Sequence, residues 1–341
     1  MTTILMTMMT TTRESDDDTA ADGDIALALA RDLADTWLTT FAPHQNAWSW
    51  DAGILMIGLL DLAETTGDPR YEDYVRDWLD HHIDAGYNIS SSDTSVPGYS
   101  ALRLYEKYGH AKYLTVADDV WHYIRDVAGR TSDGGLNHLG WISGNQIWID
   151  TLFMIGPFLM RYAERTGDDA PYEEYALQLD VFRTHLRSPE FAFYRHRYDD
   201  DTGEVAPEDD LFWGRGNGWV FAAQSLALGE MPESVTSSLS FDLRADLDEM
   251  EAAFDESRAG APRLTTILNV PETYRETSVG LLVAYGKLLR SREDGEPRMD
   301  DVEDLLQGAI DQIVVDEAGD TLLLGTSYGT SPAICLTTRK C

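Results

Sequence analysis

A turn motif that occurs three times constrains the fold of this chain more than any other feature. At Gly67, Gly109 and Gly167, a helical segment is followed by the glycine, by a tyrosine four or five residues later and by a second helical segment. A glycine in this place can end a helix in the left-handed conformation. The three glycines are spaced by 42 and 58 residues. Repeated helical hairpins of this size indicate either an open solenoid or a closed α/α toroid.

The two helices of each hairpin differ in polarity. The helix before the turn is the more apolar one, as in AGILMIGLLDLA, and the helix after it is more charged, as in YEDYVRDWLDHH. This asymmetry is typical of an inner ring of helices wrapped by an outer ring. Six such hairpins fit into 341 residues. We therefore predict an all-α chain that forms an (α/α)6 barrel.

Helical periodicity runs along most of the chain and is interrupted by glycines, prolines and polar loops. Two short stretches, 191–198 and 320–324, have weak strand character and are expected to form hairpins within loops. The segments predicted to be helical are 24–38, 48–65, 71–83, 99–108, 113–127, 144–166, 172–187, 219–228, 240–254, 276–290 and 299–313.

The charge of the chain restricts its partners and its setting. Asp and Glu number 60 against 26 Lys and Arg, which gives a net charge of −34. Phosphate binding needs clustered basic residues, so a nucleic-acid partner is not expected. Self-repulsion of this size is screened when salt is concentrated. The composition therefore predicts a halophilic, haloarchaeal-type protein of a salt-rich cytoplasm.

The two ends of the chain differ from the rest in composition. Residues 1–22 lack the basic segment of a signal peptide and are predicted to form a disordered acidic leader, followed by one domain over 23–341. Both cysteines, Cys335 and Cys341, lie in the last seven residues, so neither a disulfide framework nor a cysteine metal site is expected. No apolar run reaches the length of a membrane span.

One acid lies within an otherwise apolar stretch. The segment 144–158, GNQIWIDTLFMIGPF, contains Asp150 with Trp148 two residues before it. A helix that is hydrophobic all round is normally buried. A buried carboxylate must be paired, or its pKa must shift. A buried acid beside an indole indicates a functional site. The alternative is a helix N-cap acid at a loop-to-helix junction.

A second motif, WGRGNGW at 213–219, combines three glycines with two tryptophans and an arginine. We expect a ligand-facing turn ahead of a helix. Tryptophan faces stack on sugar rings, an arginine pairs bidentately with a carboxylate, and glycines let the backbone approach a ligand. The structural alternative is a glycine-rich cap before an inner helix.

These two motifs together resemble those of the unsaturated rhamnogalacturonyl hydrolases, glycoside hydrolase family 105, and of the related family 88 unsaturated glucuronyl hydrolases. The resemblance runs from about residue 25 to 330, and the family's six-hairpin α/α barrel agrees with the repeat. Supporting matches are the stretch 48–58, Asp93 with Pro97 and Gly98, His138 after a double glycine, the segment 196–199, and Glu276 to Ser278.

The resemblance implies a glycosidase that hydrates a carbon–carbon double bond. Its substrate would be a lyase-generated oligosaccharide with a 4,5-unsaturated uronic acid, galacturonyl or glucuronyl, at the non-reducing end. By motif position, Asp150 is the acid that protonates C4 and the base that then activates water. This role needs a pKa raised towards the working pH; burial would raise it, and a helix N-terminus would lower it. Asp93 is either a second catalytic carboxylate or an ordinary turn residue.

The resemblance also implies how the sugar is held. Arg215 would bind the uronate carboxylate, and Trp213 and Trp219 would wall the ring. His196 and His138 would hydrogen-bond hydroxyl groups. No metal or other cofactor is expected, and the oligomeric state is expected to be monomer or homodimer. The substrate-binding residues implied are Arg215, Trp213, Trp219, Trp148, His196, His138, Asn217 and Trp50.

Two departures from the family pattern and two other functions stay open. Leu139 follows the loop histidine where the family has a basic residue, so one substrate contact is absent or replaced. The tail, about 326–341, does not match the apolar segment that closes the family's barrel. A sugar epimerase or isomerase on the same barrel would need catalytic histidines on inner helices. A non-catalytic helical scaffold would have no need of WGRGNGW.

Overall fold

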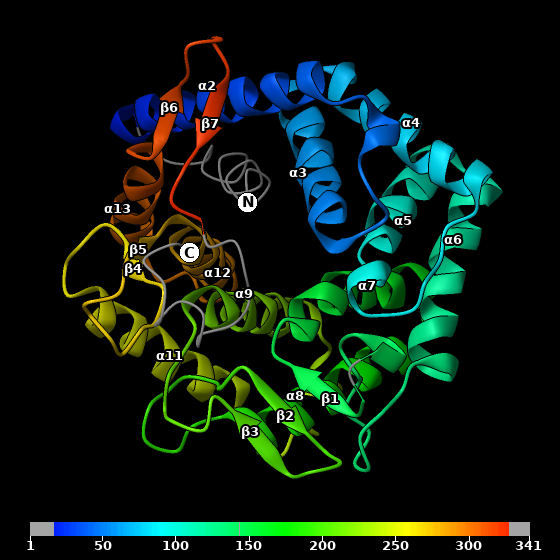
Figure 1. The fold of residues 1–341 in the computed structure, drawn as a ribbon, viewed down its shortest axis with the longest axis vertical. Helices are drawn as coiled ribbons and strands as arrows, with labels where there is room; N and C mark the ends of the chain where they lie inside the picture. The colour runs from blue at the N-terminus through cyan, green and yellow to red at the C-terminus, as the bar shows by residue number, and fades with distance from the viewer. Residues whose placement is uncertain (1–16, 143, 327–341) are drawn as a thin grey trace.

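The computed structural model describes residues 17–142 and 144–326, and in them the chain forms two concentric rings of helices (Figure 1). The (α/α)6 barrel predicted from the repeat is confirmed. The outer helices are α2 (Asp17–Thr40), α4 (Pro69–Ala85), α6 (Ala111–His122), α8 (Ala170–Leu186), α11 (Leu243–Arg258) and α13 (Met299–Ile310). The inner helices are α3 (Trp50–Thr66), α5 (Pro97–Tyr108), α7 (Thr151–Thr166), α9 (Gly214–Glu230) and α12 (Thr277–Asp294). A short helix, α10 (Glu233–Thr236), follows α9, and a π-helical turn, Tyr123–Val127, continues α6.

The repeated glycines end the inner helices as the sequence predicts. Gly67, Gly109 and Gly167 are C-caps of α3, α5 and α7, with φ angles of 70°, 70° and 67°. In each, the glycine N–H donates to the carbonyl four residues back, which is a helix-ending bond that the left-handed conformation permits. The outer helix then begins within a few residues, so each turn forces an antiparallel hairpin.

The inner and outer helices bury different fractions of their surface. On α3 most side chains are buried all round, whereas α4 buries one stripe that includes Tyr71, Val75 and Trp78. The inner helices α9 and α12 approach closely at Gly286, where an added Cβ would lie 2.5 Å from the Phe221 ring. The hydrophobic core is therefore the shared wall between the two rings.

Short strands lie in the segments that follow outer helices along the chain. The strands β1 (Gln146–Trp148), β2 (Arg197–Asp199) and β3 (Glu204–Ala206) form an antiparallel sheet in the order β1-β2-β3. Two hairpins complete the set: β4 (Leu264–Thr265) with β5 (Arg275–Glu276), and β6 (Ile313–Val315) with β7 (Thr321–Leu323). The hairpin expected near 320–324 is therefore confirmed, whereas in the stretch 191–198 only the last two residues lie in a strand.

Most helix boundaries differ from the sequence prediction by four residues or fewer, and three differences are larger. Residues 146–148 are a strand rather than helix, and α7 begins only after Asp150. Helix α9 begins at Gly214, five residues before the expected start. Helix α2 begins at Asp17, inside the segment predicted to be a disordered leader. Residues 1–16 and the atypical tail from residue 327 lie outside the described residues, so their predictions stay untested.

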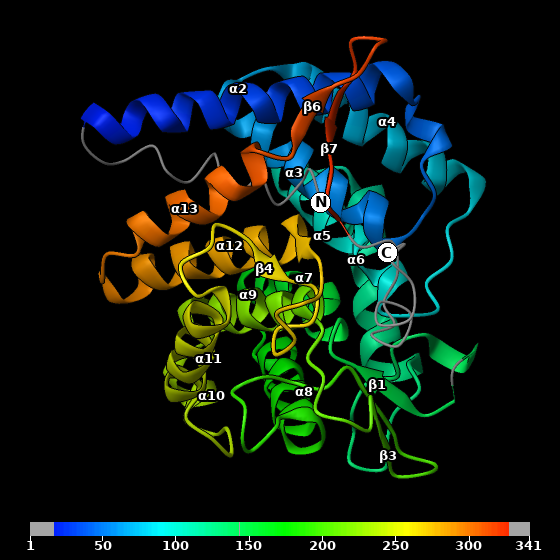
Figure 2. The ribbon, with the colours of Figure 1, turned by 60° about the vertical axis from the view of Figure 1, so that its left-hand side comes forward.

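After β7 the chain returns to the N-terminus of α12. The Thr277 N–H donates to the Gly325 carbonyl over 2.7 Å, and the Thr277 hydroxyl donates to the Leu324 carbonyl over 2.8 Å. Within the described residues the ring has six outer and five inner helices, and Figure 2 shows the β6–β7 hairpin beside α2. Among the helices of the described residues, none has the length and apolarity needed to cross a membrane.

Candidate active site

Asp150 is fixed at the junction between β1 and α7. The β1–β2 pairing places Trp148 opposite Arg197, and next to this pair the Ile149 N–H donates to the His196 carbonyl over 3.0 Å. This brings the His196 ring to Asp150, with 3.1 Å between Nε2 and Oδ2. Asp150 is the N-cap residue by backbone position, but its side chain caps no helical N–H. The carboxylate is 5 % exposed, so its main partner is the imidazole.

A second carboxylate, Asp93, comes from the loop between α4 and α5. It opens the 3-10 turn η2 (Asp93–Ser95), and the Trp48 indole holds this turn by donating to the Thr94 carbonyl over 2.9 Å. The Asp93 Oδ1 atom lies 3.5 Å from Nε2 of His138. On the other side of that ring, Nδ1 lies 2.9 Å from the Thr151 hydroxyl. Asp93 thus lies beside a histidine whose other ring nitrogen contacts the first residue of α7.

The two carboxylates have pKa values that move in opposite directions. Burial raises the pKa of Asp93 to about 7, and the negative charges of Asp150 and Asp51 add to this rise. For Asp150, burial also favours the protonated form, but the hydrogen bond from His196 and the nearby positive charges outweigh it, so its pKa is lowered. Burial does raise the pKa of Asp150, as the sequence predicts, but the hydrogen bond from His196 and the neighbouring charges dominate. The raised pKa belongs to Asp93.

The histidine beside Asp93 is neutral at ordinary pH. His138 is buried, and desolvation lowers its pKa to about 4. It stacks on Trp148 with ring centroids 5.1 Å apart, and Trp148 meets His196 edge-on at the same separation. The indole therefore separates the two imidazoles and fixes both. Both histidines lie in loop segments, as the sequence predicts.

Arg215 lies in the first turn of α9 and forms a buried ion pair. Its NH1 atom donates to the Glu276 carboxylate over 3.3 Å, and its guanidinium lies 4.7 Å from the centre of the Trp213 ring. Both partners are almost fully buried, and Glu276 is 0 % exposed. A buried arginine held in this way can bind the carboxylate of a ligand with little loss of side-chain freedom.

The WGRGNGW motif is a regular helix rather than the expected turn. All three of its glycines lie in α9, where they make room for close neighbours. An added Cβ would come within 2.8 Å of the Thr265 carbonyl at Gly214, within 2.7 Å of the Ile149 side chain at Gly216, and within 2.9 Å of Leu282 at Gly218. The sequence prediction failed because these glycines serve packing, not backbone freedom. The alternative of a glycine-rich cap before an inner helix is also not what is found, because the glycines lie inside α9 and Arg215 and Trp219 of the motif line a pocket.

These groups open onto one cavity of about 280 Å³, which we call the Asp150 pocket. It lies where loops meet the N-terminal ends of the inner helices. Of the residues expected to bind substrate, Trp50, His138, Trp148, Arg215 and Trp219 line it, as do both candidate catalytic acids. Leu139 and Met154 complete the lining. Leu139 therefore gives an apolar wall at the position where the family resemblance led us to expect a basic residue.

Three expected binding residues lie behind this lining. His196 bonds to Asp150, and Trp213 packs between His196 and Arg215. Asn217 is fully buried: its amide donates to the Tyr194 and Trp213 carbonyls and accepts from the Tyr194 N–H. These three side chains hold the elements of the site together. None of the three is among the residues that line the Asp150 pocket.

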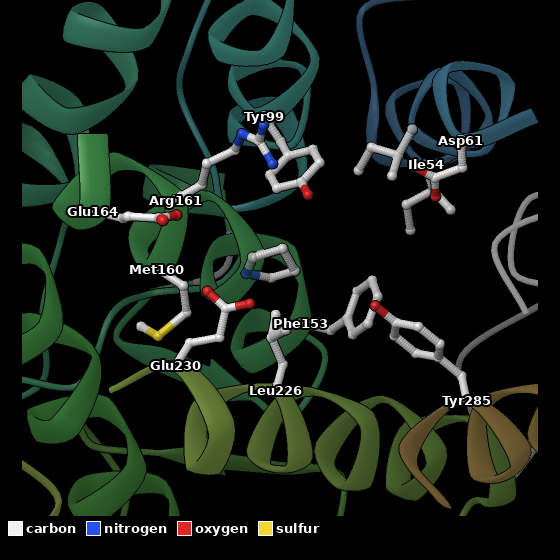
Figure 3. Close-up of a pocket in the computed structure, with 12 residues that line it drawn as sticks. Ile54, Asp61, Tyr99, Phe153, Met160, Arg161, Glu164, Leu226, Glu230 and Tyr285 are labelled. Carbon is white, nitrogen blue, oxygen red and sulfur yellow. The ribbon is translucent and has the colours of Figure 1, made fainter. Parts of the chain in front are cut away.

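A second cavity, of about 110 Å³, lies in the middle of the ring and is called here the central cavity (Figure 3). All five described inner helices contribute to it. Phe153 lines it and packs on Trp219 at 4.4 Å, so this aromatic pair separates it from the Asp150 pocket. Figure 3 shows Phe153 and Tyr285 on one side of the cavity and Glu164 and Glu230 on the other.

The sequence prediction gave no role to some residues of this site. Glu276 appeared in a matching motif, but nothing marked it as the partner of Arg215. The hydroxyl groups of Ser92 and Thr151, which meet His138, were also missed. The one sequence feature that could have indicated them is that each is adjacent to a candidate acid: Ser92 precedes Asp93, and Thr151 follows Asp150.

The arrangement can hold one proton between two carboxylates beside a cation. Interacting carboxylates titrate as a pair, and unequal surroundings assign the proton mainly to one of them. Arg215 and the three tryptophans of the lining supply a surface for an anionic ring. An acid, a base and an anion-binding group therefore face the same small cavity.

The family model described as Glycosyl Hydrolase Family 88 matches residues 25–333. The unsaturated rhamnogalacturonyl hydrolase YesR of Bacillus subtilis (strain 168) is 27% identical over 253 residues, which is 71% of this chain and 72% of the relative. An unsaturated 3S-rhamnoglycuronyl hydrolase of Alteromonas sp. (strain LOR) is 28% identical over 212 residues, 56% of this chain and 49% of the relative.

Solved structures show the same architecture. A family 105 glycoside hydrolase from C. acetobutylicum ATCC 824 superposes with a TM-score of 0.77 at 20% identity and covers 88% of each chain. A possible family 105 member from Klebsiella pneumoniae gives a TM-score of 0.75 at 24% identity, over 84% of this chain and 74% of the other. At this level of identity the likeness is one of fold.

Proposed function

The chain belongs to glycosyl hydrolase family 88, and from this premise we propose that it removes a 4,5-unsaturated uronic acid from the non-reducing end of an oligosaccharide by hydrating the C4=C5 double bond. Membership of the family makes it a glycoside hydrolase that acts on oligosaccharides. The names of YesR and of the Alteromonas enzyme support the unsaturated substrate. The alternatives of an epimerase or a scaffold have no comparable support.

One observation carries the proposal: two carboxylates with opposite pKa shifts face one pocket that Arg215 also lines. Most glycosidases place two carboxylates on either side of the anomeric carbon. Hydration of a vinyl ether instead needs a proton for C4 and a water for C5. In the proposed reaction Asp150 serves first as the acid and then as the base, and Asp93 holds the proton before substrate binds.

In our proposal, substrate binding moves the proton from Asp93 to Asp150. Without substrate, Asp93 holds the proton, and the positive charge of Arg215 helps to keep Asp150 ionised. When the uronate carboxylate pairs with Arg215, that charge is neutralised and the pKa of Asp150 rises. Exclusion of water from the closed pocket acts in the same direction.

Asp150 then transfers its proton to C4 while a water molecule adds at C5. The water gives its proton to the Asp150 carboxylate, so the acid is restored. The product at C5 is a hemiketal, which opens to a ketone and leaves C1 as a hemiacetal. Breakdown of that hemiacetal to an aldehyde releases the rest of the oligosaccharide. His196 orients Asp150 throughout, since it holds the carboxylate at 3.1 Å.

The double bond provides the test, because unsaturated uronyl groups absorb in the ultraviolet and the hydrated product does not. The protein is incubated in molar salt with unsaturated galacturonyl and glucuronyl disaccharides, and the absorbance is followed. We expect it to fall with one or both substrates. An unchanged absorbance on both, with release of sugar from neither, would reject the function.

Several finer points belong to the same proposal. The preference between galacturonyl and glucuronyl substrates is left to this assay. We propose that the enzyme works as a monomer or homodimer in a salt-rich cytoplasm, and the net charge of −34 supports the salt-rich setting. Activity that is highest in dilute buffer would contradict that setting without affecting the reaction.

A further inference from the structure

A buried carboxylate that the reaction does not use, Glu276, lies behind the wall of the Asp150 pocket. It is the last residue of β5 and the N-cap residue of α12, yet its side chain caps no helical N–H. It is 0 % exposed. A buried ionised carboxylate is costly unless it is paired and hydrogen-bonded. The position of this acid therefore depends on its partners.

Three donors from different places in the sequence surround the Glu276 carboxylate. Arg215 donates to Oε1 over 3.3 Å, the Ser278 hydroxyl donates to the same oxygen, and the Thr266 hydroxyl donates to Oε2 over 3.0 Å. The Thr266 carbonyl also accepts from the Gly214 N–H over 2.8 Å. The β4–β5 hairpin thus contacts both the residue before Arg215 and the acid that pairs with Arg215.

From this geometry we propose that Glu276 is the positioning residue for Arg215, fixing the plane and the location of the guanidinium so that it meets the substrate's carboxylate. This inference rests on the proposed function only for the identification of the substrate's carboxylate as that of a uronic acid. Thr266 takes part by holding the other carboxylate oxygen of Glu276, and Ser278 by donating to the oxygen that Arg215 also contacts. The α9–α12 contact, which is closely packed at Gly286, provides the rigid base for this arrangement.

The arrangement has two physical consequences. A guanidinium held by a carboxylate loses less rotational freedom when it binds a second carboxylate, so binding is stronger than for an unrestrained arginine. The negative charge of Glu276 also offsets the positive charge of Arg215. Without this offset, Arg215 would favour the ionised forms of Asp93 and Asp150 more strongly. Removing the charge of Glu276 should therefore shift the loss of activity at high pH towards lower pH.

The main test is a double-mutant cycle with Glu276→Gln and Arg215→Ala. In the wild-type background, Glu276→Gln should lower kcat/KM roughly tenfold to hundredfold, mostly through KM, because a misplaced binding group costs about this much. In the Arg215→Ala background, the same change should alter kcat/KM by less than about twofold, because its effect passes through Arg215. Glu276→Asp, which keeps the charge, should recover part of the loss.

A second readout separates positioning from a general role in folding. Wild-type enzyme should prefer the free acid of the substrate over its methyl ester, and Glu276→Gln should reduce that preference. Equal losses on acid and ester, or an undiminished loss in the Arg215→Ala background, would overturn the proposal. If Glu276→Gln does not fold, Thr266→Val tests the same chain of contacts, and an unchanged preference in that variant would also overturn it.

Binding of galacturonic acid, measured by calorimetry, keeps this inference separate from the proposed reaction. It needs no double bond and no catalysis. If the wild type binds the acid and Glu276→Gln binds it several-fold more weakly, the positioning role holds even where the hydration assay fails. Equal binding by the wild type and by a folded Glu276→Gln variant would reject the positioning role whatever the hydration assay gives.

Discussion

The Asp150 pocket and the central cavity share lining from α3, α7 and α9 but differ in how their acids are held. In the Asp150 pocket, each carboxylate meets a histidine from a loop: Asp150 meets His196, and Asp93 meets His138. In the central cavity, no histidine is among the described lining residues, and Asp61 and Arg161 form ion pairs across neighbouring helices, with Arg103 and Glu106. Asp61 of the central cavity therefore links two neighbouring inner helices, α3 and α5, through an ion pair.

The comparison shows what a raised pKa does and does not indicate. Burial and the charge of Glu164 raise the pKa of Glu230 in the central cavity, and burial raises that of Asp93 in the Asp150 pocket. An arginine lines each cavity, Arg161 in one and Arg215 in the other, but Asp93 also has a neighbouring carboxylate, Asp150, whose pKa is lowered. A pair of opposite shifts beside an anion-binding group indicates acid–base chemistry, whereas a single raised value indicates burial.

The largest effect is expected from Asp150→Asn. The variant keeps the shape and the contact with His196 but has no proton to give or take, so kcat should fall roughly 10²- to 10⁴-fold, towards the upper end because both steps use this group. The ultraviolet assay measures the loss, and an unchanged melting temperature serves as the control for folding. Activity above a tenth of the wild-type value would show that Asp150 is not the acid.

Arg215→Ala should have the next largest effect. Truncating one partner of a buried charge pair costs about 2–5 kcal/mol, which corresponds to a loss in kcat/KM of roughly 30-fold to several thousand-fold. Arg215→Lys keeps the charge but not the planar fork, and should recover only part of the loss. If the alanine variant hydrates the substrate with an unaltered KM, the carboxylate is bound elsewhere.

Asp93→Asn tests the pH dependence that the Asp150 pocket predicts. In the wild type, kcat/KM should fall as the pH rises through about 7, because the pair then loses its shared proton. The asparagine variant should be less active, and the fall near pH 7 should disappear from its profile. A fall at the same pH in both proteins would assign that ionisation to another group.

Asp93→Asn should also increase the stability of the fold at high pH. The folded protein holds the proton of Asp93 more tightly than the unfolded chain, so ionisation destabilises the fold progressively between pH 3.8 and about 7. A pKa difference of this size corresponds to at most about 4 kcal/mol. Asp93→Asn should therefore unfold at higher temperature than the wild type at pH 8, and the advantage should shrink at pH 4.

The smallest effect is expected from Glu230→Gln in the central cavity. Its kcat/KM should stay within about twofold of the wild type, because the change is remote from the reacting groups. The melting temperature at pH 8 should rise slightly, since the fold no longer contains a carboxylate that burial and Glu164 make harder to ionise. A large loss of activity would mean that the central cavity takes part in the reaction.

Much of the fold could be predicted because its signals are local. The glycines at 67, 109 and 167 end helices through their own backbone conformation, which neighbouring residues dictate. The boundaries that were missed depend on distant partners. Residues 146–148 form a strand because β2, some fifty residues later, pairs with them. The glycines of α9 are helical because Ile149, Thr265 and Leu282 leave no room for side chains.

The candidate site was predictable in its members but not in their division of roles. Asp150, Asp93, Arg215 and four of the other named residues meet at one pocket. Periodicity and motifs could not show that Trp213 and Asn217 support the pocket from behind, because exposure to a cavity is a property of the packed molecule. Nor could they identify Glu276, whose link to Arg215 spans 61 residues.

What the sequence determined by itself is the ring of helical hairpins, its acidic surface and the list of reactive groups. Each follows from residue type and short-range spacing. What only the tertiary structure decided is which carboxylate holds the proton. That outcome depends on the His196 contact, on the charges around each acid and on burial, and these interactions act through space between residues far apart in the chain.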